Sequence, residues 1–263
     1  MKSNAKARAK RSLGQNFLRD DAVVGRMIDS LKPIPGDKVV EIGPGTGALT
    51  RELVDSGCHV TVIEFDRDLI PLLNEQFGSR DNFTLFHDDA LAISFDEIVD
   101  GTDKAKLVAN LPYNISTPIL QRLIDHRELF SQMVLMFQRE VVERITATPG
   151  GKERGFLSVL VEGAFETEYL FDVPPTAFYP VPKVWSAVVR LTPKEPVITD
   201  EKAFRRLVST AFAQKRKTLA NNLRIIYQDP GDLLVKAGID GKRRAETLTL
   251  DEWVTLHNTI SNQ

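Results

Sequence analysis

The 263-residue sequence predicts an α/β fold, in which a seven-stranded, Rossmann-like sheet precedes a small all-helical C-terminal domain. Three observations predict this fold. Short apolar runs alternate with helical stretches as far as Pro193. A glycine-rich turn follows the first of these runs, and after Pro193 only helical periodicity remains. We therefore expect two domains, residues 1–193 and 194–263.

The first domain is organised around residues 38–50. An apolar run over residues 39–42 is typical of a central parallel strand covered on both faces. Gly43, Gly45 and Gly47 then allow a tight turn and a close backbone approach, before a predicted helix over residues 48–56. The first N–H groups of that helix face whatever lies above the strand end, so the turn predicts a cofactor site.

The same alternation orders the rest of this domain. Residues 1–12 are basic and lack apolar periodicity, so we expect a flexible tail, followed by a helix that begins at Asp20 or Asp21 and ends at Ser30. The last two predicted strands are joined by a short proline-rich connection, which favours antiparallel neighbours at one edge of the sheet. The remaining predictions are strands over residues 59–63, 83–86, 107–110, 133–137, 168–173 and 184–191, and helices over 139–146 and 156–165.

Beyond Pro196 the apolar residues recur at intervals of three and four, as on one face of a helix. Thr249 and Glu252 have the spacing of a capping box, which marks the start of the last helix. Trp253 and Leu256 supply the buried side of that helix.

The whole-chain composition is that of an ordinary globular protein, with 42% hydrophobic and 27% charged residues. Cys58 is the only cysteine, which excludes an intramolecular disulfide. No apolar run approaches the roughly 20 residues of a membrane span, and no signal-type stretch follows the basic N-terminus. We expect a cytoplasmic protein without a membrane partner.

The net charge of −2 conceals an uneven distribution. Residues 1–193 contain 22 basic and 27 acidic residues, whereas residues 194–263 contain 12 and 9. The basic residues of the second part cluster at Arg205, Arg206, Lys215, Arg216 and Lys217. Such basic runs usually lie on solvated surfaces, so charge alone leaves contact with nucleic acid open.

Polar side chains fall at the ends of three predicted strands. Glu64 follows the second strand, Asp89 lies just beyond the third, and Asn110 closes the fourth. Ligands of doubly wound sheets bind above these strand ends, so the three side chains and the glycine turn predict one pocket. The turn also fits the G-x-G-x-x-[GA] dinucleotide fingerprint, so by itself it leaves a dinucleotide, an adenosyl cofactor or a structural turn open.

Residues 110–113, Asn-Leu-Pro-Tyr, distinguish these possibilities. They place a side-chain carbonyl, a backbone carbonyl held by the following proline, and an aromatic ring at the lip of the pocket. This arrangement is what methylation of an exocyclic amine on a flat base such as adenine requires, which favours an adenosyl methyl donor as the cofactor. The amine of adenine is a poor nucleophile because its lone pair is delocalised into the ring. Two acceptors that bond its hydrogens favour the pyramidal form, which can attack the methyl group. Tyr113 can stack on a base that has left its helix or loop, which is worth about 1 to 3 kcal/mol.

This chemistry requires neither a general base nor a metal. The proton of the methylated amine is acidic enough to leave to water. The four histidines are scattered through the sequence and indicate no metal site. Catalysis would then consist of alignment and fixed dipoles.

Together these motifs resemble the ribosomal RNA adenine N6,N6-dimethyltransferase family, and within it the bacterial small-subunit (kasugamycin-sensitivity) branch. The resemblance implies S-adenosylmethionine as cofactor, and we expect a monomer, although nothing in the sequence itself fixes the oligomeric state. It also implies the substrate: two adjacent adenines in the 3′-terminal hairpin loop of 16S rRNA, each dimethylated, in the small subunit or its precursor. The matching segments are residues 13–18, 41–47, 64–66, 88–90, 110–115, 138–140, 178–184, 215–219 and 221–223.

The resemblance also assigns roles to individual residues. Glu64 would bind the ribose hydroxyls of the cofactor, Asp89 its adenine amine, and Gly43 its methionine part. Phe178 would sandwich the flipped adenine opposite Tyr113. The full implied sets are Asn16, Leu18, Gly43, Gly45, Glu64, Asp89 and Asn110 for the cofactor; Asn110, Leu111, Pro112, Tyr113 and Phe178 for catalysis; and Arg205, Arg206, Lys215, Arg216 and Lys217 for RNA phosphates.

Two other functions compete with this interpretation: an adenine methyltransferase acting on large-subunit rRNA or DNA, and a non-catalytic ribosome-assembly factor on the same fold. Gly14, residues 114–118 and the lysine-rich C-terminal segment favour the small-subunit branch, and the intact motifs favour catalysis. Residues 213–215, Ala-Gln-Lys, depart from the arginine-rich pattern of the family, which leaves the details of RNA contact open.

Overall fold

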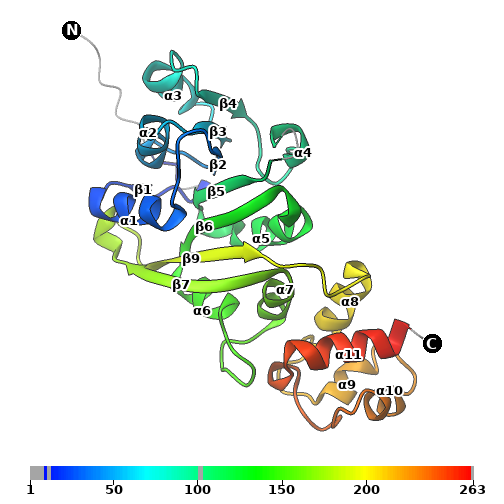
Figure 1. Ribbon diagram of the computed structural model, residues 1–263. Coiled ribbons are helices and arrows are strands. Elements are labelled where there is room, and N and C mark those ends of the chain that lie inside the picture. The colour runs from blue at the N-terminus through cyan, green and yellow to red at the C-terminus, as the bar shows by residue number, and fades with distance from the viewer. Residues whose placement is uncertain (1–8, 11–12, 100–102, 262–263) are drawn as a thin grey trace. The chain divides into compact units, whose positions relative to one another are not determined.

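The computed structural model describes residues 9–10, 13–99 and 103–261, which form two compact units (Figure 1). The first unit comprises the described residues up to Val142 together with Glu168–Pro193. The second comprises Glu143–Thr167 and the described residues from Lys194 onward. The second unit thus resumes at the predicted boundary after Pro193, but Glu143–Thr167 belong to it and not to the first domain, where the sequence placed them. Most of the predicted flexible tail, residues 1–8 and 11–12, lies outside the described residues.

The first unit is built on a seven-stranded sheet in the order β4-β3-β2-β5-β6-β9-β7. Parallel pairing joins β2 to β3 and β5, β3 to β4, and β5 to β6, whereas β9 is antiparallel to β6. The predicted sheet and its antiparallel edge are therefore confirmed, and Figure 1 shows β7 and β9 running in opposite directions. The strands are β2 Lys38–Ile42, β3 His59–Glu64, β4 Phe83–His87, β5 Ala105–Asn110, β6 Phe130–Gln138, β7 Phe165–Val173 and β9 Ser186–Pro193.

Helices α1 (Asp21–Leu31) and α2 (Ala48–Asp55) pack together against one face of the sheet. Asp20 begins α1 by accepting the backbone N–H groups of Ala22 and Val23. Fully buried Met27 of α1 and Leu53 of α2 join the valines of the central strands in one apolar core. This packing fixes the position of the turn between β2 and α2. The other helices of this unit are α3 Ile70–Phe77, α4 Phe95–Ile98 and α5 Ser116–Asp125.

A second, two-stranded sheet was not predicted. Strand β1 (Phe17–Leu18) pairs antiparallel with β8 (Phe178–Tyr179), so that Leu18 lies opposite Phe178. Two residues are too few to show the period of a strand, and the partner lies far along the chain. The pairing ties the N-terminal segment to the loop that precedes β9.

The second unit is helical. The predicted capping box is confirmed: the Thr249 N–H donates to Glu252 Oε2 at 2.8 Å, and the Glu252 N–H donates to Thr249 Oγ1 at 3.2 Å. Fully buried Trp253 stacks on Phe212 at 6.0 Å between ring centroids. The helices are α7 Phe156–Ala164, α8 Glu201–Ala211, α9 Leu219–Leu223, α10 Pro230–Lys236 and α11 Leu250–Ser261, and α6 Arg139–Ile145 ends in this unit.

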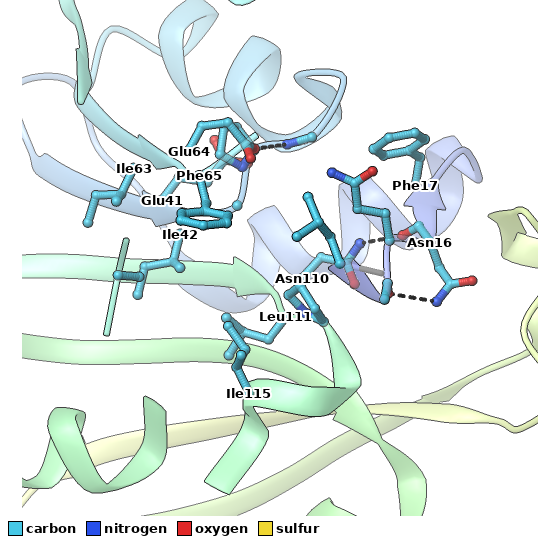
Figure 2. A pocket seen from close by; sticks show the side chains of 18 of the residues that line it. Asn16, Phe17, Glu41, Ile42, Ile63, Glu64, Phe65, Asn110, Leu111 and Ile115 are labelled. Carbon is cyan, nitrogen blue, oxygen red and sulfur yellow. Dashed lines mark hydrogen bonds between the residues drawn. The ribbon is translucent and has the colours of Figure 1, made fainter. Parts of the chain in front are cut away.

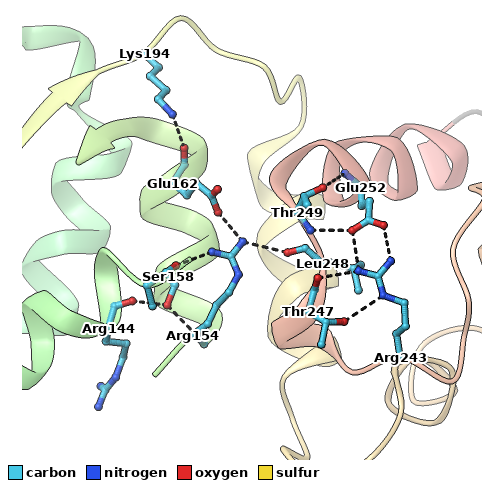
Figure 3. Close-up of polar contacts among 12 residues, drawn as sticks. Arg144, Arg154, Ser158, Glu162, Lys194, Arg243, Thr247, Leu248, Thr249 and Glu252 are labelled. Carbon is cyan, nitrogen blue, oxygen red and sulfur yellow. Dashed lines mark hydrogen bonds and ion pairs between the residues drawn. The ribbon is translucent and has the colours of Figure 1, made fainter. Parts of the chain in front are cut away.

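Arg154 explains why the segment around α7 belongs to this unit (Figure 3). Its side chain is 1% exposed, and it pairs with Glu162 at 2.6 Å. Its guanidinium also donates to the backbone carbonyl of Leu248 at 3.2 Å, which joins the segment to the start of α11. One arginine making a contact so distant in sequence leaves no periodic signal, so the sequence did not predict this boundary. No helix of the described residues is long and apolar enough to cross a membrane.

Candidate active site

A pocket opens above the carboxyl ends of β2, β3 and β5, with the segment of residues 13–18 as one wall (Figure 2). The strands end together because Ile42 pairs with Ile63 of β3 and with Ala109 of β5. The structure brings all but one of the predicted cofactor and catalytic residues into this lining: Asn16, Leu18, Gly43, Gly45, Glu64, Asp89, Asn110, Leu111, Pro112 and Tyr113.

The floor of the pocket is the glycine turn between β2 and α2. Gly45 has a φ of +58°, and a Cβ placed on it would lie 3.1 Å from the ring of Phe17. Gly47 has a φ of +84°, and its Cβ would lie 2.6 Å from the ring of Phe77. Both the positive φ angles and the close aromatic neighbours therefore require glycine, and the missing side chains let a ligand approach the backbone of the turn closely.

Glu64 closes one side of the pocket at the end of β3. Its side chain accepts the Gly45 N–H at 3.3 Å through Oε2 and the Asp66 N–H at 2.7 Å through Oε1. Desolvation raises the pKa of this carboxyl, while the backbone N–H groups act in the opposite direction. These bonds hold a buried acceptor beside the glycine turn.

Glu41 is a second buried acid in the pocket wall, and sequence reasoning gave it no role. It is 1% exposed and accepts a hydrogen bond from Thr50 Oγ1 at 2.6 Å. Desolvation raises its pKa to about 8, and the nearby Glu64 adds to this effect. The available signal was an acid within an otherwise apolar strand, directly before the glycine turn.

The raised pKa of Glu41 predicts a pH dependence of stability. An unfolded glutamate has a pKa near 4.5, so the folded state binds this proton more tightly. The resulting stabilisation is complete below pH 4.5 and is lost as the pH rises towards 8, with a slope of at most about 1.4 kcal/mol per pH unit. We expect Glu41→Gln to flatten the decline of the free energy of unfolding between pH 5 and 8 in urea titrations. Glu52→Gln, on the exposed face of α2, is the control, and equal declines for both variants would refute the assignment.

Residues 110–113 form the corner opposite Glu64. Asn110 Nδ2 donates to the backbone carbonyl of Asn16 at 3.2 Å (Figure 2). This bond engages the amide nitrogen, so the side-chain oxygen is the atom that can accept from an amine in the pocket. The Leu111 N–H donates to Met136 on the neighbouring strand at 3.2 Å, and the Pro112 carbonyl accepts the Ile115 N–H at 3.2 Å. The corner is therefore rigid on both sides of the Leu111 carbonyl.

Tyr113 is half-buried at the lip of this corner. Its hydroxyl is hydrogen-bonded to Ser186 Oγ at the start of β9, at 3.0 Å. Desolvation raises the pKa of Tyr113 above its usual value, so the ring stays neutral at physiological pH. The hydrogen bond fixes the orientation of a flat ring on which a base can stack.

The N-terminal wall is held by ionic contacts that correct the prediction of a flexible tail at Lys10. Lys10 pairs with Asp66 and, at 2.6 Å, with Asp68. Gln15 donates to the other oxygen of Asp66 at 2.8 Å. Desolvation raises the pKa of Asp66, but the hydrogen bonds from Lys10 and Gln15 outweigh it and hold the pKa below its usual value. Lys10 and Gln15 thus both attach the N-terminal segment to the turn that follows β3.

Two further residues of the pocket lining, Asp89 and Phe65, have groups that a ligand can contact. Asp89 accepts the Leu91 N–H at 2.8 Å through Oδ1, which leaves its second oxygen for a ligand. Phe65 is 58% exposed although it lines the pocket (Figure 2). An exposed ring in a ligand cavity is a stacking surface. Sequence reasoning placed Phe65 in a family motif but gave it no role.

Phe178 is the predicted catalytic residue that the structure does not bring into the pocket. It is 3% exposed and belongs to the apolar core, opposite Leu18 in the β1–β8 pairing. Its ring therefore packs in the core in this structure, and the sandwich of a base between Phe178 and Tyr113 stays a prediction.

The predicted RNA-binding residues lie in the second unit, on α8 and in the loop that follows it. Arg205 is half-buried, whereas Arg206, Lys215, Arg216 and Lys217 are exposed. Lys215 Nζ donates to the backbone carbonyl of Lys152 at 3.4 Å. Among the residues that the structure describes, no cluster of three or more His, Cys, Asp or Glu side chains could hold a metal ion.

Comparisons with known proteins agree on one family. The family model described as Ribosomal RNA adenine dimethylase matches residues 6–262. The chain is 44% identical over 259 residues to the ribosomal RNA small subunit methyltransferase A of Pseudomonas syringae pv. syringae (strain B728a), covering 97% of this chain and 96% of that protein. It is 45% identical over 256 residues to the protein of the same name from Acinetobacter baylyi, covering 96% and 93%.

Solved structures show the same likeness. A dimethyladenosine transferase from Plasmodium falciparum superposes with a TM-score of 0.77 at 26% identity, covering 91% of this chain and 95% of that chain. The 23S rRNA methyltransferase ErmE superposes with a TM-score of 0.71 at 26% identity, covering 94% and 100%.

Proposed function

Because the chain belongs to the ribosomal RNA adenine dimethylase family, we propose that its pocket methylates two adjacent adenines in the 3′-terminal hairpin loop of 16S rRNA. The protein is an S-adenosylmethionine-dependent adenine dimethyltransferase of small-subunit rRNA. The observation that carries the proposal is the Asn110 corner, whose two carbonyl oxygens are positioned independently of any ligand.

We assign each part of S-adenosylmethionine to residues of the pocket lining. Glu64 accepts from the ribose hydroxyls, and the exposed ring of Phe65 stacks on the adenine. Asp89 accepts from the adenine amine through its second oxygen. Gly43 and Gly45 let the methionine part approach the backbone, and Asn16 and Leu18 close the pocket over it.

When bound, S-adenosylmethionine supplies an electrophilic methyl group on a sulfonium. The protein contributes alignment. Asn110 Oδ1 and the Leu111 carbonyl accept the two hydrogens of the target amine, so that its lone pair points away from the ring of the base. Tyr113 stacks on the extruded base, held by Ser186. The proton of the methylated amine leaves to water, and the free amine can be methylated a second time.

The exposed basic residues of the second unit would hold the RNA through its phosphates. We expect simultaneous reversal of Lys215, Arg216 and Lys217 to glutamate to weaken RNA binding and to flatten the dependence of log K on log salt. The measurement is fluorescence anisotropy of a labelled hairpin between 50 and 200 mM salt, roughly the range over which phosphate contacts dominate. Lys104→Glu serves as the control, because Lys104 is exposed and precedes the amino end of β5, whereas the pocket lies at the carboxyl ends of the strands. An unchanged salt slope in the triple variant would show that other residues hold the phosphates.

The proposed function is tested with S-adenosylmethionine carrying a labelled methyl group. Purified small and large ribosomal subunits that lack these methyl groups, and protein-free 16S rRNA, are incubated separately with the enzyme, and the modified bases are mapped. We expect label on the two adjacent adenines of the small-subunit hairpin. We propose that the enzyme acts in the cytoplasm, as a monomer, on the small subunit or its precursor. Label in 23S rRNA alone would contradict the proposal and favour the large-subunit alternative.

A further inference from the structure

The segment of residues 179–185, which runs from the last residue of β8 through the loop before β9, exposes more apolar surface than a solvated loop requires. We call it the aromatic rim. Four of its seven residues are large apolar side chains with high exposure: Tyr179 is 52% exposed, Val181 62%, Val184 43% and Trp185 47%. Such side chains gathered in one short loop mark a binding surface.

Both ends of the rim are attached to the pocket wall. At one end Tyr179 pairs with Phe17, which lines the pocket beside Gly45. At the other end Trp185 is followed by Ser186, whose hydroxyl holds Tyr113 at 3.0 Å. The rim is therefore fixed beside the place where the target base stacks, and not merely on the same side of the molecule.

The rim combines its aromatic rings with cationic groups. The Arg19 guanidinium lies 4.2 Å from the centre of the Tyr179 ring. Lys183 is exposed within the loop, and the backbone N–H of Arg139 donates to the Trp185 carbonyl at 3.0 Å, which fixes the end that carries the indole. Aromatic rings interleaved with cations are the pattern by which proteins bind single-stranded nucleic acid.

We propose that the aromatic rim binds the unpaired nucleotides that flank the target adenine. Trp185 and Tyr179 stack on their bases, and Arg19 and Lys183 contact their phosphates. The proposal rests on the proposed function and adds to it how the hairpin loop is held while one base enters the pocket. Two stacked neighbours would also offset part of the free energy that unstacking the target base costs.

Tryptophan fluorescence tests the rim directly, because the chain has only two tryptophans and the other, Trp253, is fully buried in the second unit. An RNA hairpin with the 3′-terminal loop sequence of 16S rRNA is titrated into the full-length protein. We expect quenching in the wild type and almost none in Trp185→Phe. Trp185→Ala should weaken hairpin binding by about 5- to 100-fold, the loss expected for one stacked base, with unchanged affinity for S-adenosylmethionine. Trp185→Phe should recover most of the binding.

Ile34→Ala removes a side chain that is 62% exposed in the loop before β2 and should leave binding unchanged. This loop lies at the amino end of β2, whereas the pocket lies at its carboxyl end. The proposed role of the aromatic rim would be overturned by equal quenching in the wild type and Trp185→Phe, or by wild-type affinity of Trp185→Ala for the hairpin. The proposed function would still be upheld if the wild type methylates the adenines. A wild type that binds the hairpin but methylates no adenine in it or in the small subunit would overturn the proposed function, and the rim with it.

Discussion

Asn110→Ala lowers the turnover of adenine methylation by about 100-fold or more, as the loss of one preorganised polar contact in an active site does. The variant removes the side-chain oxygen that we propose accepts from the target amine, whereas the glycine turn and Glu64, which we propose hold the cofactor, are untouched. The affinity for S-adenosylmethionine therefore stays measurable by calorimetry, and the loss appears in single-turnover methylation at saturating cofactor and RNA.

Asn74→Ala is the matched control, because it makes the same chemical change on the exposed face of α3. It should leave turnover and cofactor affinity at wild-type values. Dimethylation at the wild-type rate by Asn110→Ala would remove this side chain from the mechanism.

Glu64→Ala should weaken the binding of S-adenosylmethionine by about 10²- to 10⁴-fold, because two hydrogen bonds to a charged group, worth about 1.5 to 3 kcal/mol each, are lost. The variant also leaves the Gly45 N–H without its acceptor, which loosens the turn beneath the ligand. The measurement is cofactor affinity by calorimetry together with turnover as a function of cofactor concentration.

The expected signature separates binding from chemistry: the cofactor KM rises steeply, while turnover at saturating cofactor falls much less than in Asn110→Ala. Glu52→Ala, on the exposed face of α2, should change neither quantity. An unaltered cofactor affinity in Glu64→Ala would mean that the ribose is bound elsewhere.

The sheet and most of the pocket could be predicted because their signals are local. An apolar strand, a glycine turn and a polar strand end each occupy a few consecutive residues, and the parallel register then brings Glu64 and Asn110 to the same edge. The start of the last helix was equally legible, since Thr249 and Glu252 lie within one turn.

The features that escaped prediction depend on contacts between distant residues. The β1–β8 pairing joins Leu18 to Phe178, and the same pairing buries the ring that the sequence assigned to base stacking. Arg154 attaches the segment around α7 to the C-terminal helices through Leu248. The raised pKa of Glu41 also escaped prediction, because it arises from desolvation and from the neighbouring Glu64 in the folded protein. The residue type alone does not reveal it.

The central claim is that Asn110 and Leu111 present two oxygens to an adenine amine beside the sulfur of the cofactor. The most direct measurement is a crystal structure of the protein with S-adenosylhomocysteine and the 16S rRNA hairpin. We predict that Asn110 Oδ1 and the Leu111 carbonyl lie within about 2.7 to 3.2 Å of the adenine N6, with the base stacked on Tyr113. A complex in which both oxygens face away from the space next to the sulfur would contradict the account.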